Sequence, residues 1–429
     1  MALKPIAALA GPTGDRWSGN LRGYESDRLG FLLHTKAEFG GMAKFDSHTT
    51  IVNDPQLATE ILLDRNNSFA IRENYRGERL GTAEIEETRR LRPALNPGMR
   101  RARAAVITPS VPGLLTRELP AVSAGSVDPL PMLERVCAQS IAGFYFGPDA
   151  HVVVPGIRAM LDALDDYFGN PFSLPTSWPT PGRRRIHRCH RELESVLVPL
   201  LRERAHRAEV RDEDLATVIV SALRRTGESP SLERVGQMVI GSLLAAQRVP
   251  AAAAAWMLWE VARAPEMQLK LRSEAARYSG MISCGALPNA NGYRLAMAVV
   301  LETLRLHPPT WLLHRNLLRN EPIGGYNVPR GHNLLISPYV LHRDETRFEN
   351  AGNFWVDRWL AEQPPPSAFM PFGRGLHGCP GSEVAVAMLV ALLLTTLNAY
   401  EVTAVGSDVV ADPRSTLLPS GLQLVFTPS

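Results

Sequence analysis

Cys379 lies in a glycine-rich stretch near the end of the chain, and its type and surroundings suit metal chemistry. The stretch reads Phe372-Gly373-Arg374-Gly375-Leu376-His377-Gly378-Cys379-Pro380-Gly381. A thiolate is the form of cysteine that binds metals, and backbone N–H groups and a helix N-terminus favour it. The mostly apolar run from Val384 to Leu397 predicts such a helix directly after the cysteine.

A single cysteine suits one kind of metal cofactor. The four cysteines of the chain, at positions 137, 189, 284 and 379, are scattered and form no Cys-x-x-Cys pair. One cysteine cannot supply a four-cysteine iron–sulfur or zinc site, whereas haem iron needs just one axial thiolate. The glycines would let the backbone approach a flat ligand closely. Haem iron bound by Cys379 is therefore the simplest interpretation, and a structural cysteine in a turn is the alternative.

The same stretch matches the Phe-Gly-x-Gly-x-His-x-Cys-x-Gly signature of the cytochrome P450 family at every defining position, so the chain resembles that family. The resemblance spans about residues 30–427. It implies a mainly α fold with small β-sheets, in which haem b lies between a long distal helix and the loop and helix that follow Cys379. We expect residues 1–429 to form one domain, with residues 1–29 as a lead-in.

Two further motifs occur in the order that this family has. Glu302 and Arg305 are three residues apart and share a helix face. Alone they would be a surface ion pair, but the resemblance implies a buried lock in which Arg358 is the third member. A carboxylate between two guanidinium groups can be bound bidentately. We expect these residues to fold the site and not to catalyse.

The resemblance also places haem contacts on three segments. Arg92, Arg315 and His377 match the positions of propionate ligands, and propionates need cationic or hydrogen-bonding partners when partly buried. Thr88 stands where many members have histidine or tryptophan, so that contact is weakened or replaced. The cysteine stretch supplies further contacts at Phe372, Gly373 and Gly381.

The segment 324–337 predicts strand, turn and strand, and His342-Arg343-Asp344 follows it as in the family.

The expected distal helix, about residues 232–264, departs from the family pattern. Where members usually carry Ala-Gly-x-(Asp/Glu)-Thr, this chain has Ala245-Ala246-Gln247-Arg248-Val249 and then Pro250. In the family the threonine hydroxyl organises proton delivery to dioxygen, and valine can neither donate a proton nor hold a water. We therefore expect release of hydrogen peroxide unless substrate or water replaces the hydroxyl. Pro250 lacks an N–H group and should kink the helix.

Arg248 has two interpretations that the sequence leaves open. It could turn away from the haem into a salt bridge or toward solvent. It could instead anchor an anion in the distal pocket, since fatty-acid peroxygenases of the superfamily carry an arginine followed by proline here. Val249 intervenes in this chain, so that pattern is only partly met.

Substrate contacts are expected from the loop 71–83, from a proline-rich lid at 168–184, from the distal helix and from residues 309–313. Apolar residues there suggest a pocket for a hydrocarbon-like molecule, although each could be ordinary core. They are Leu243, Leu244, Trp311, Leu312, Leu313, Leu417 and Leu418. The lid could equally be a connector without substrate contact.

These features predict a monomeric, cytoplasmic haem-thiolate monooxygenase that oxidises a small apolar natural-product intermediate such as a terpenoid. The alternatives are a peroxide-driven peroxygenase that uses Arg248, or a haem protein of this fold without normal turnover. With 46 basic and 43 acidic residues, the net charge argues against a nucleic-acid partner, and no membrane span is expected. Ferredoxin and ferredoxin reductase are the expected electron donors. Basic residues of a possible docking patch, or of a solvated helix face, are Arg89, Arg90, Arg100, Arg101 and Arg103.

Overall fold

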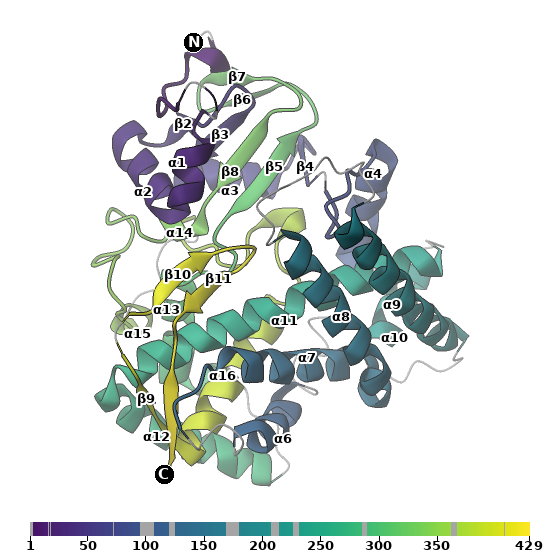
Figure 1. Ribbon diagram of the computed structural model, residues 1–429, viewed down its shortest axis with the longest axis vertical. Coiled ribbons are helices and arrows are strands. Elements are labelled where there is room, and N and C mark those ends of the chain that lie inside the picture. Colours follow the sequence, from purple (N-terminus) through teal and green to yellow (C-terminus); the bar gives the residue numbers. More distant parts are fainter. Residues whose placement is uncertain are drawn as a thin grey trace.

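A computed structural model gives the fold, which is mainly helical with small sheets gathered near the N-terminal elements and at the C-terminal end (Figure 1). It describes residues 3–15, 17, 19–71, 73–94, 107–119, 125–168, 180–206, 214–225, 231–284, 290–361, 367–406 and 408–429. Most of the segment 168–184 that was expected to form a lid lies outside these residues, as do Arg100, Arg101 and Arg103.

Helices make up most of the described structure. Their bounds are α1 Leu21–Ser26, α2 Arg28–Phe39, α3 Pro55–Leu63, α4 Thr82–Leu91, α6 Ile107–Glu118, α7 Leu130–Phe146, α8 Ala150–Phe168, α9 Pro181–His206, α10 Leu215–Arg225, α11 Leu232–Ala262, α12 Pro265–Ser283, α13 Arg294–Leu306, α14 Pro338–Leu341, α15 Asp357–Ala361 and α16 Ser382–Ala399.

The strands are short and form small sheets. Their bounds are β1 Lys4–Pro5, β2 Met42–Lys44, β3 Thr49–Val52, β4 Phe69–Ala70, β5 Leu313–Leu317, β6 Glu321–Ile323, β7 Tyr326–Val328, β8 Asn333–Ile336, β9 Tyr400–Ala404, β10 Val410–Pro413, β11 Leu417–Ser420 and β12 Leu424–Pro428. The largest sheet has the order β2-β3-β8-β5-β4, and β1-β7-β6 form a second one. The pairs β10-β11 and β12-β9 stand apart.

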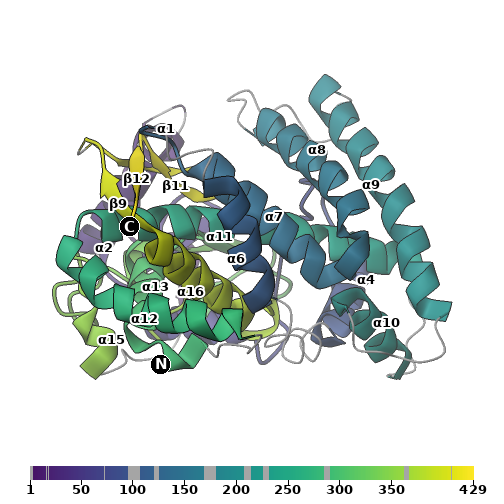
Figure 2. The ribbon, with the colours of Figure 1, turned by 90° about the horizontal axis from the view of Figure 1, so that it is seen from below.

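Two long apolar helices run through the middle of the molecule. α11 crosses it diagonally in Figure 1, and α16 lies beside α12 and α6 in Figure 2. Both are long and apolar enough to cross a membrane by composition, but their most apolar windows are 61% and 56% buried inside the protein. Their hydropathy is therefore accounted for by the core that they build.

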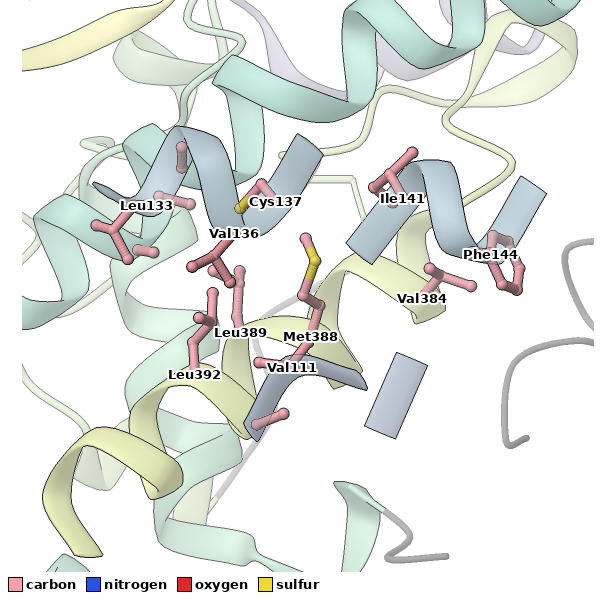
Figure 3. Packing of buried hydrophobic residues seen from close by; sticks show 14 of the residues in the cluster. Val111, Leu133, Val136, Cys137, Ile141, Phe144, Val384, Met388, Leu389 and Leu392 are labelled. Atoms are coloured by element: carbon pink, nitrogen blue, oxygen red, sulfur yellow. The ribbon is translucent and has the colours of Figure 1, made fainter. Parts of the chain in front are cut away.

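The core beneath the cysteine stretch joins α16 to α7 and α6. Figure 3 shows side chains of α7, among them Val136, Cys137 and Ile141, pointing toward Met388 and Leu389 of α16. Val136, Cys137, Met388 and Leu389 are each at most 2% exposed. Protein interiors are packed like organic crystals, so this contact fixes the direction in which α16 leaves the loop.

Several local predictions are confirmed. The helix expected at Val384–Leu397 is α16, and the distal helix expected at 232–264 is α11. Ser231 caps α11 by accepting a hydrogen bond from the Arg234 N–H. The segment 324–337 does form strand, turn and strand, but β7 and β8 pair with different sheets and not with each other.

Candidate functional site

The loop before α16 is held in shape by its own backbone. The Cys379 N–H donates to the Phe372 carbonyl at 2.8 Å, and the Gly378 N–H donates to the Gly375 carbonyl at 3.0 Å. Gly375 has a φ of +67°, and a Cβ added there would lie 2.3 Å from the Leu62 carbonyl oxygen of α3. Only glycine permits both this conformation and this close approach.

The Cys379 side chain is accessible to solvent although much of it is surrounded by protein. The residue is exposed to a solvent-sized probe, yet burial raises the pKa of its thiol. The Gly381 N–H and the nearby Arg92 cation act in the opposite direction and lower that pKa. The N–H group and the cation both favour the thiolate form of Cys379.

α11 provides a second exposed surface in the interior. Ala245 is exposed in the middle of this helix, whereas Leu243, Leu244 and Gln247 are at most 6% exposed. α11 packs against α16, the helix that follows Cys379. The exposed face of α11 and the exposed cysteine therefore belong to one neighbourhood, as a flat cofactor between them requires.

Three cationic or hydrogen-bonding side chains gather beside the cysteine loop. Arg92 donates to the Leu376 carbonyl at 2.7 Å and to the Gly378 carbonyl at 3.3 Å. Burial lowers the pKa of Arg315 to about 10, and burial together with Arg315 and Arg92 lowers that of His377 to about 3. These shifts show positive charge gathered in a desolvated place.

The same cluster leaves polar atoms without partners. Within the described part of the chain, Arg315 Nε and His377 Nε2 have no hydrogen-bond partner, and neither Arg92 nor Arg315 forms an ion pair. Arg315 is only 2% exposed, so water does not satisfy it from bulk solvent. Buried polar atoms of this kind need partners, and two carboxylates from a ligand would supply them. The residues thus fit the propionates of haem.

Thr88 is directed elsewhere and needs a corrected role. Its hydroxyl donates to the Glu84 carbonyl at 2.8 Å and accepts from Arg234 at 3.3 Å. It therefore joins α4 to α11 and is not brought into the cation cluster. Phe372 contributes the carbonyl that accepts from Cys379, Gly373 has a φ of +64°, and Gly381 stands at the N-cap of α16.

Glu302, Arg305 and Arg358 meet in the interior. Arg305 binds the Glu302 carboxylate bidentately at 2.9 and 2.8 Å, and Arg358 Nε reaches it at 3.2 Å. The side chains of Glu302 and Arg305 are 0% exposed. The arrangement matches the predicted three-membered lock, and Arg305 also donates to the His342 and Ala351 carbonyls at 2.9 and 2.7 Å.

The lock has members that the sequence did not reveal. The Trp355 N–H and the Trp359 indole N–H both donate to Glu302, at 2.8 and 2.7 Å. His342 accepts from the Met370 N–H at 2.9 Å, and its other ring nitrogen lies 3.0 Å from the Arg305 carbonyl. The His342 ring thereby connects the lock to the start of the cysteine loop. Trp359, next to Arg358, was the available signal for the indole hydrogen bond, whereas Trp355 contributes only a backbone N–H that its residue type does not indicate.

Arg248 is engaged by two carboxylates. Its Nε lies 2.9 Å from Glu134 of α7, and its NH1 contacts Asp165 of α8. Burial acts to lower the pKa of Arg248, but the hydrogen bonds to these carboxylates outweigh it and raise the pKa. The structure therefore places Arg248 in the salt-bridge arrangement, and the hypothesis of an unpaired anion anchor is not supported by this geometry.

Other predicted residues divide between pocket and core. Leu243 and Leu244 belong to the main core, and Trp311 and Leu417 to a smaller core near β3, each at most 6% exposed. Leu312, Leu313 and Leu418 are half-buried. α11 runs through Val249 and Pro250 without interruption, and Val249 is half-buried on it.

Arg89, expected on a solvated helix face, is instead buried. Its side chain is 9% exposed, forms an ion pair with Asp64 at 3.2 Å and donates to the Phe69 carbonyl. The pair forms because the end of α4 packs on the loop that carries Asp64. Arg89 is thus removed from any docking patch.

Comparison with known proteins agrees with this geometry. The family model described as Cytochrome P450 matches residues 32–426. Human lanosterol 14-alpha demethylase is 30% identical over 246 residues, which are 56% of this chain and 48% of the demethylase, so the match covers about half of that relative. Mitochondrial cytochrome P450 302a1 of Drosophila melanogaster is 28% identical and aligns over 94% of this chain and 91% of its own.

Two further similarities bear on fold and function. The cyclooctat-9-en-7-ol 5-monooxygenase of Streptomyces melanosporofaciens is 25% identical over 80% of this chain and 77% of its own. The crystal structure of the cytochrome P450DA haem domain superposes with a TM-score of 0.81 at 19% identity, over 100% of this chain and 98% of that one. The second similarity concerns the fold alone, which is mainly helical with small sheets in both.

Proposed function

The chain belongs to the cytochrome P450 family, which binds haem, and from this premise we propose that it is a monooxygenase acting on an apolar natural-product intermediate such as a terpenoid. The reaction would be a hydroxylation, a desaturation or a related C–H oxidation. When bound, haem supplies the activation of dioxygen. The observation that carries the proposal is the solvent-accessible Cys379 thiol beside the cluster of Arg92, Arg315 and His377.

The choice of an apolar, uncharged substrate is supported by the distal side. Arg248 would be the natural cation for a substrate carboxylate, but Glu134 and Asp165 already neutralise it. Two of the relatives are named for terpenoid substrates, and one of them, the cyclooctat-9-en-7-ol 5-monooxygenase, is similar along most of both chains. No observation favours the peroxide-driven alternative, which needs a free cation.

Different residues of the protein would act on the proximal and the distal face of the haem. Cys379 would bind the haem iron through its thiolate, and Arg92, Arg315 and His377 would hold the propionates. On the distal face, Ala245 and Val249 offer no proton, so water or a substrate hydroxyl would have to deliver protons in the oxygen pocket. A ferredoxin with its reductase would supply electrons.

A cysteine exchange tests the proposal. We expect Cys379→Ser to abolish the thiolate-type carbon monoxide difference band of the reduced protein, because a serine oxygen cannot replace the thiolate. Cys284→Ser, at an exposed cysteine that follows α12, is the matched control and should keep the band. Survival of the band in Cys379→Ser would refute the ligand assignment.

Val249→Thr tests the proposed proton supply. In a ferredoxin-driven assay, we expect wild type to release more hydrogen peroxide per oxidised substrate than Val249→Thr, because threonine restores a hydroxyl on the same helix face. Val239→Thr on α11, whose valine is 0% exposed, controls for a hydroxyl placed away from the exposed face. An intact thiolate band without any oxidised product in either protein would favour the haem protein that lacks turnover.

A further inference from the structure

Asp64 ends α3 beside the cysteine loop. Its backbone has a φ of +45°, and its carboxylate accepts from the N–H groups of Ser68 and Phe69 at 2.6 and 3.3 Å. One residue earlier, α3 touches the cysteine loop, where a Cβ added at Gly375 would lie 2.9 Å from Leu63 Cα. The Asp64 side chain is only 3% exposed. The turn after α3 is therefore folded around a buried carboxylate.

Arg89 of α4 binds that carboxylate. Its NH2 lies 3.2 Å from Asp64 Oδ2 and also donates to the Phe69 carbonyl, and its NH1 donates to the Asn67 carbonyl at 3.3 Å. Glu86 lies 3.9 Å from Arg89, but the Glu86 side chain is 76% exposed and is solvated by water. Arg89 itself is only 9% exposed, so Asp64 is its buried counter-ion.

The ion pair lies where three segments of the haem site meet. Arg92 directly follows α4, which carries the cation of the pair. Arg315 belongs to β5, and β5 pairs with β4, where both members of the ion pair bind the Phe69 backbone. His377 belongs to the cysteine loop, which packs on the end of α3. One pair of side chains therefore connects the three segments that we assign to the propionates.

The charges of the pair act on the same residues. Burial lowers the pKa of Arg315, and Asp64 is the one carboxylate among the described residues that acts to raise it. Burial also lowers the pKa of His377, and Arg89 is one of three arginines that add to this effect. The two members of the pair thus influence the propionate-binding residues with opposite sign.

The charge of the cluster matches that of the haem propionates. Among the described residues, the cations are Arg89, Arg92 and Arg315, and Asp64 is the buried anion. His377 is neutral at pH 7, because its pKa is about 3. Three positive charges and one negative charge leave two positive charges, which two ionised propionates neutralise. Since uncompensated charge is costly in a desolvated place, Asp64 brings the cluster to the charge that haem can balance.

We propose that Asp64 and Arg89 form an outer layer of the haem site, which holds the propionate-binding segments in place and tunes the reduction potential of the haem through its two opposite charges. Reduction adds one electron to the site, so a nearby cation favours the reduced state and a nearby anion favours the oxidised state. The inference goes beyond the proposed function, because it concerns any haem bound here and does not depend on the substrate.

A redox titration of the substrate-free, haem-loaded protein, with dithionite as reductant and mediator dyes, tests the tuning. Arg89→Met removes the cation and should lower the midpoint potential. Asp64→Asn removes the anion, keeps an acceptor for the Ser68 N–H and should raise the potential. Arg89→Lys keeps the charge without the planar fork, so its potential should stay near that of wild type. These shifts should persist at high salt, because buried charges are screened little.

Transfer of haem to apomyoglobin measures the positioning role. Arg89→Met, Arg89→Lys and Asp64→Asn should each lose haem about tenfold faster than wild type, a usual effect of removing a partner in the outer layer of a metal site. Arg272→Gln and Glu401→Gln, at an exposed ion pair between α12 and β9, are the matched controls. They should change neither the rate of haem loss nor the potential.

The inference fails if the potential does not fall in Arg89→Met or does not rise in Asp64→Asn. A pair that only braced the fold would increase haem loss without shifting the two potentials in opposite directions. Where Arg89→Met holds no haem, the potential of Asp64→Asn decides alone. An unchanged rate of haem loss in all three variants would reject the positioning role.

Discussion

The two sides of the haem site are built differently. On the side of Cys379, Glu302 and Arg305 are completely buried, and five hydrogen bonds from Arg305, Arg358, Trp355 and Trp359 reach the Glu302 carboxylate. On the distal side, the two carboxylates that bind Arg248 are 31% and 40% exposed.

This difference shows where the molecule is fixed and where it can adapt. A buried, fully bonded ionic group cannot lose one member without leaving a charge in a desolvated place. A half-exposed ionic cluster is screened by water and salt and can part at modest cost. The proximal side therefore holds the thiolate loop in one geometry, whereas the ion pairs of Arg248 on the distal side are held less firmly.

The largest effect should follow from breaking the proximal lock. Glu302→Ala leaves Arg305 and Arg358 buried without their counter-charge, and we expect a loss of about 3–5 kcal/mol in the free energy of unfolding. Urea unfolding followed by tryptophan fluorescence measures the loss, and haem bound per polypeptide measures its effect on the site. Haem content should fall with stability.

The control for that variant is an exposed ion pair. Arg319 is 55% exposed and pairs with Glu321 at 2.6 Å, and Arg319→Ala should cost less than about 1 kcal/mol. If Glu302→Ala were no more damaging than Arg319→Ala, the proximal side would not be the rigid one and the comparison would fail.

Acid should weaken the proximal side through His342. Burial lowers the pKa of this ring to about 3, so the folded protein binds fewer protons there than the unfolded chain, whose histidines titrate near 6.5. The stabilisation is complete above pH 6.5 and is lost as the pH falls from 6.5 toward 3. The slope from this one group is at most about 1.4 kcal/mol per pH unit.

Unfolding curves recorded between pH 7 and pH 4 check that slope. His342→Gln should flatten it, whereas His34→Gln, at a ring that is 69% exposed, should leave it unchanged. Equal slopes in wild type and His342→Gln would show that the link between the lock and the cysteine loop does not depend on a neutral imidazole.

The proximal side could be predicted from sequence because its chemistry is local. Cys379 and its glycines are contiguous, and Glu302 and Arg305 are one helical turn apart, so spacing alone places them. The distant partners of the lock were harder to foresee. His342 contacts the Met370 N–H and the Arg305 carbonyl only because the fold brings these residues together. The sequence indicated a role for His342 only through its place in the His342-Arg343-Asp344 triplet.

The distal side resisted prediction because its residues meet only in the folded chain. Arg248 forms an ion pair with Glu134, which lies 114 positions away in the sequence. Nothing in the spacing of these two residues indicates the pair. Trp311 and Leu417 read as pocket walls by hydrophobicity, but an apolar side chain suits the core equally, and the core holds them.

The smallest effect should come from the distal ion cluster. Arg248→Ala leaves two half-exposed carboxylates, which water can solvate, so we expect a loss of only about 1–2 kcal/mol in the free energy of unfolding. Asp165→Ala should cost less, and the double variant Arg248→Ala/Asp165→Ala should be more stable than the sum of the two losses predicts. Urea unfolding at low and high salt measures all three, and the coupling should shrink as salt screens it. A loss in Arg248→Ala as large as in Glu302→Ala, and insensitive to salt, would mean that α11 is locked to α7 and α8 as firmly as Glu302 is to Arg305, and that substrate must enter without parting them.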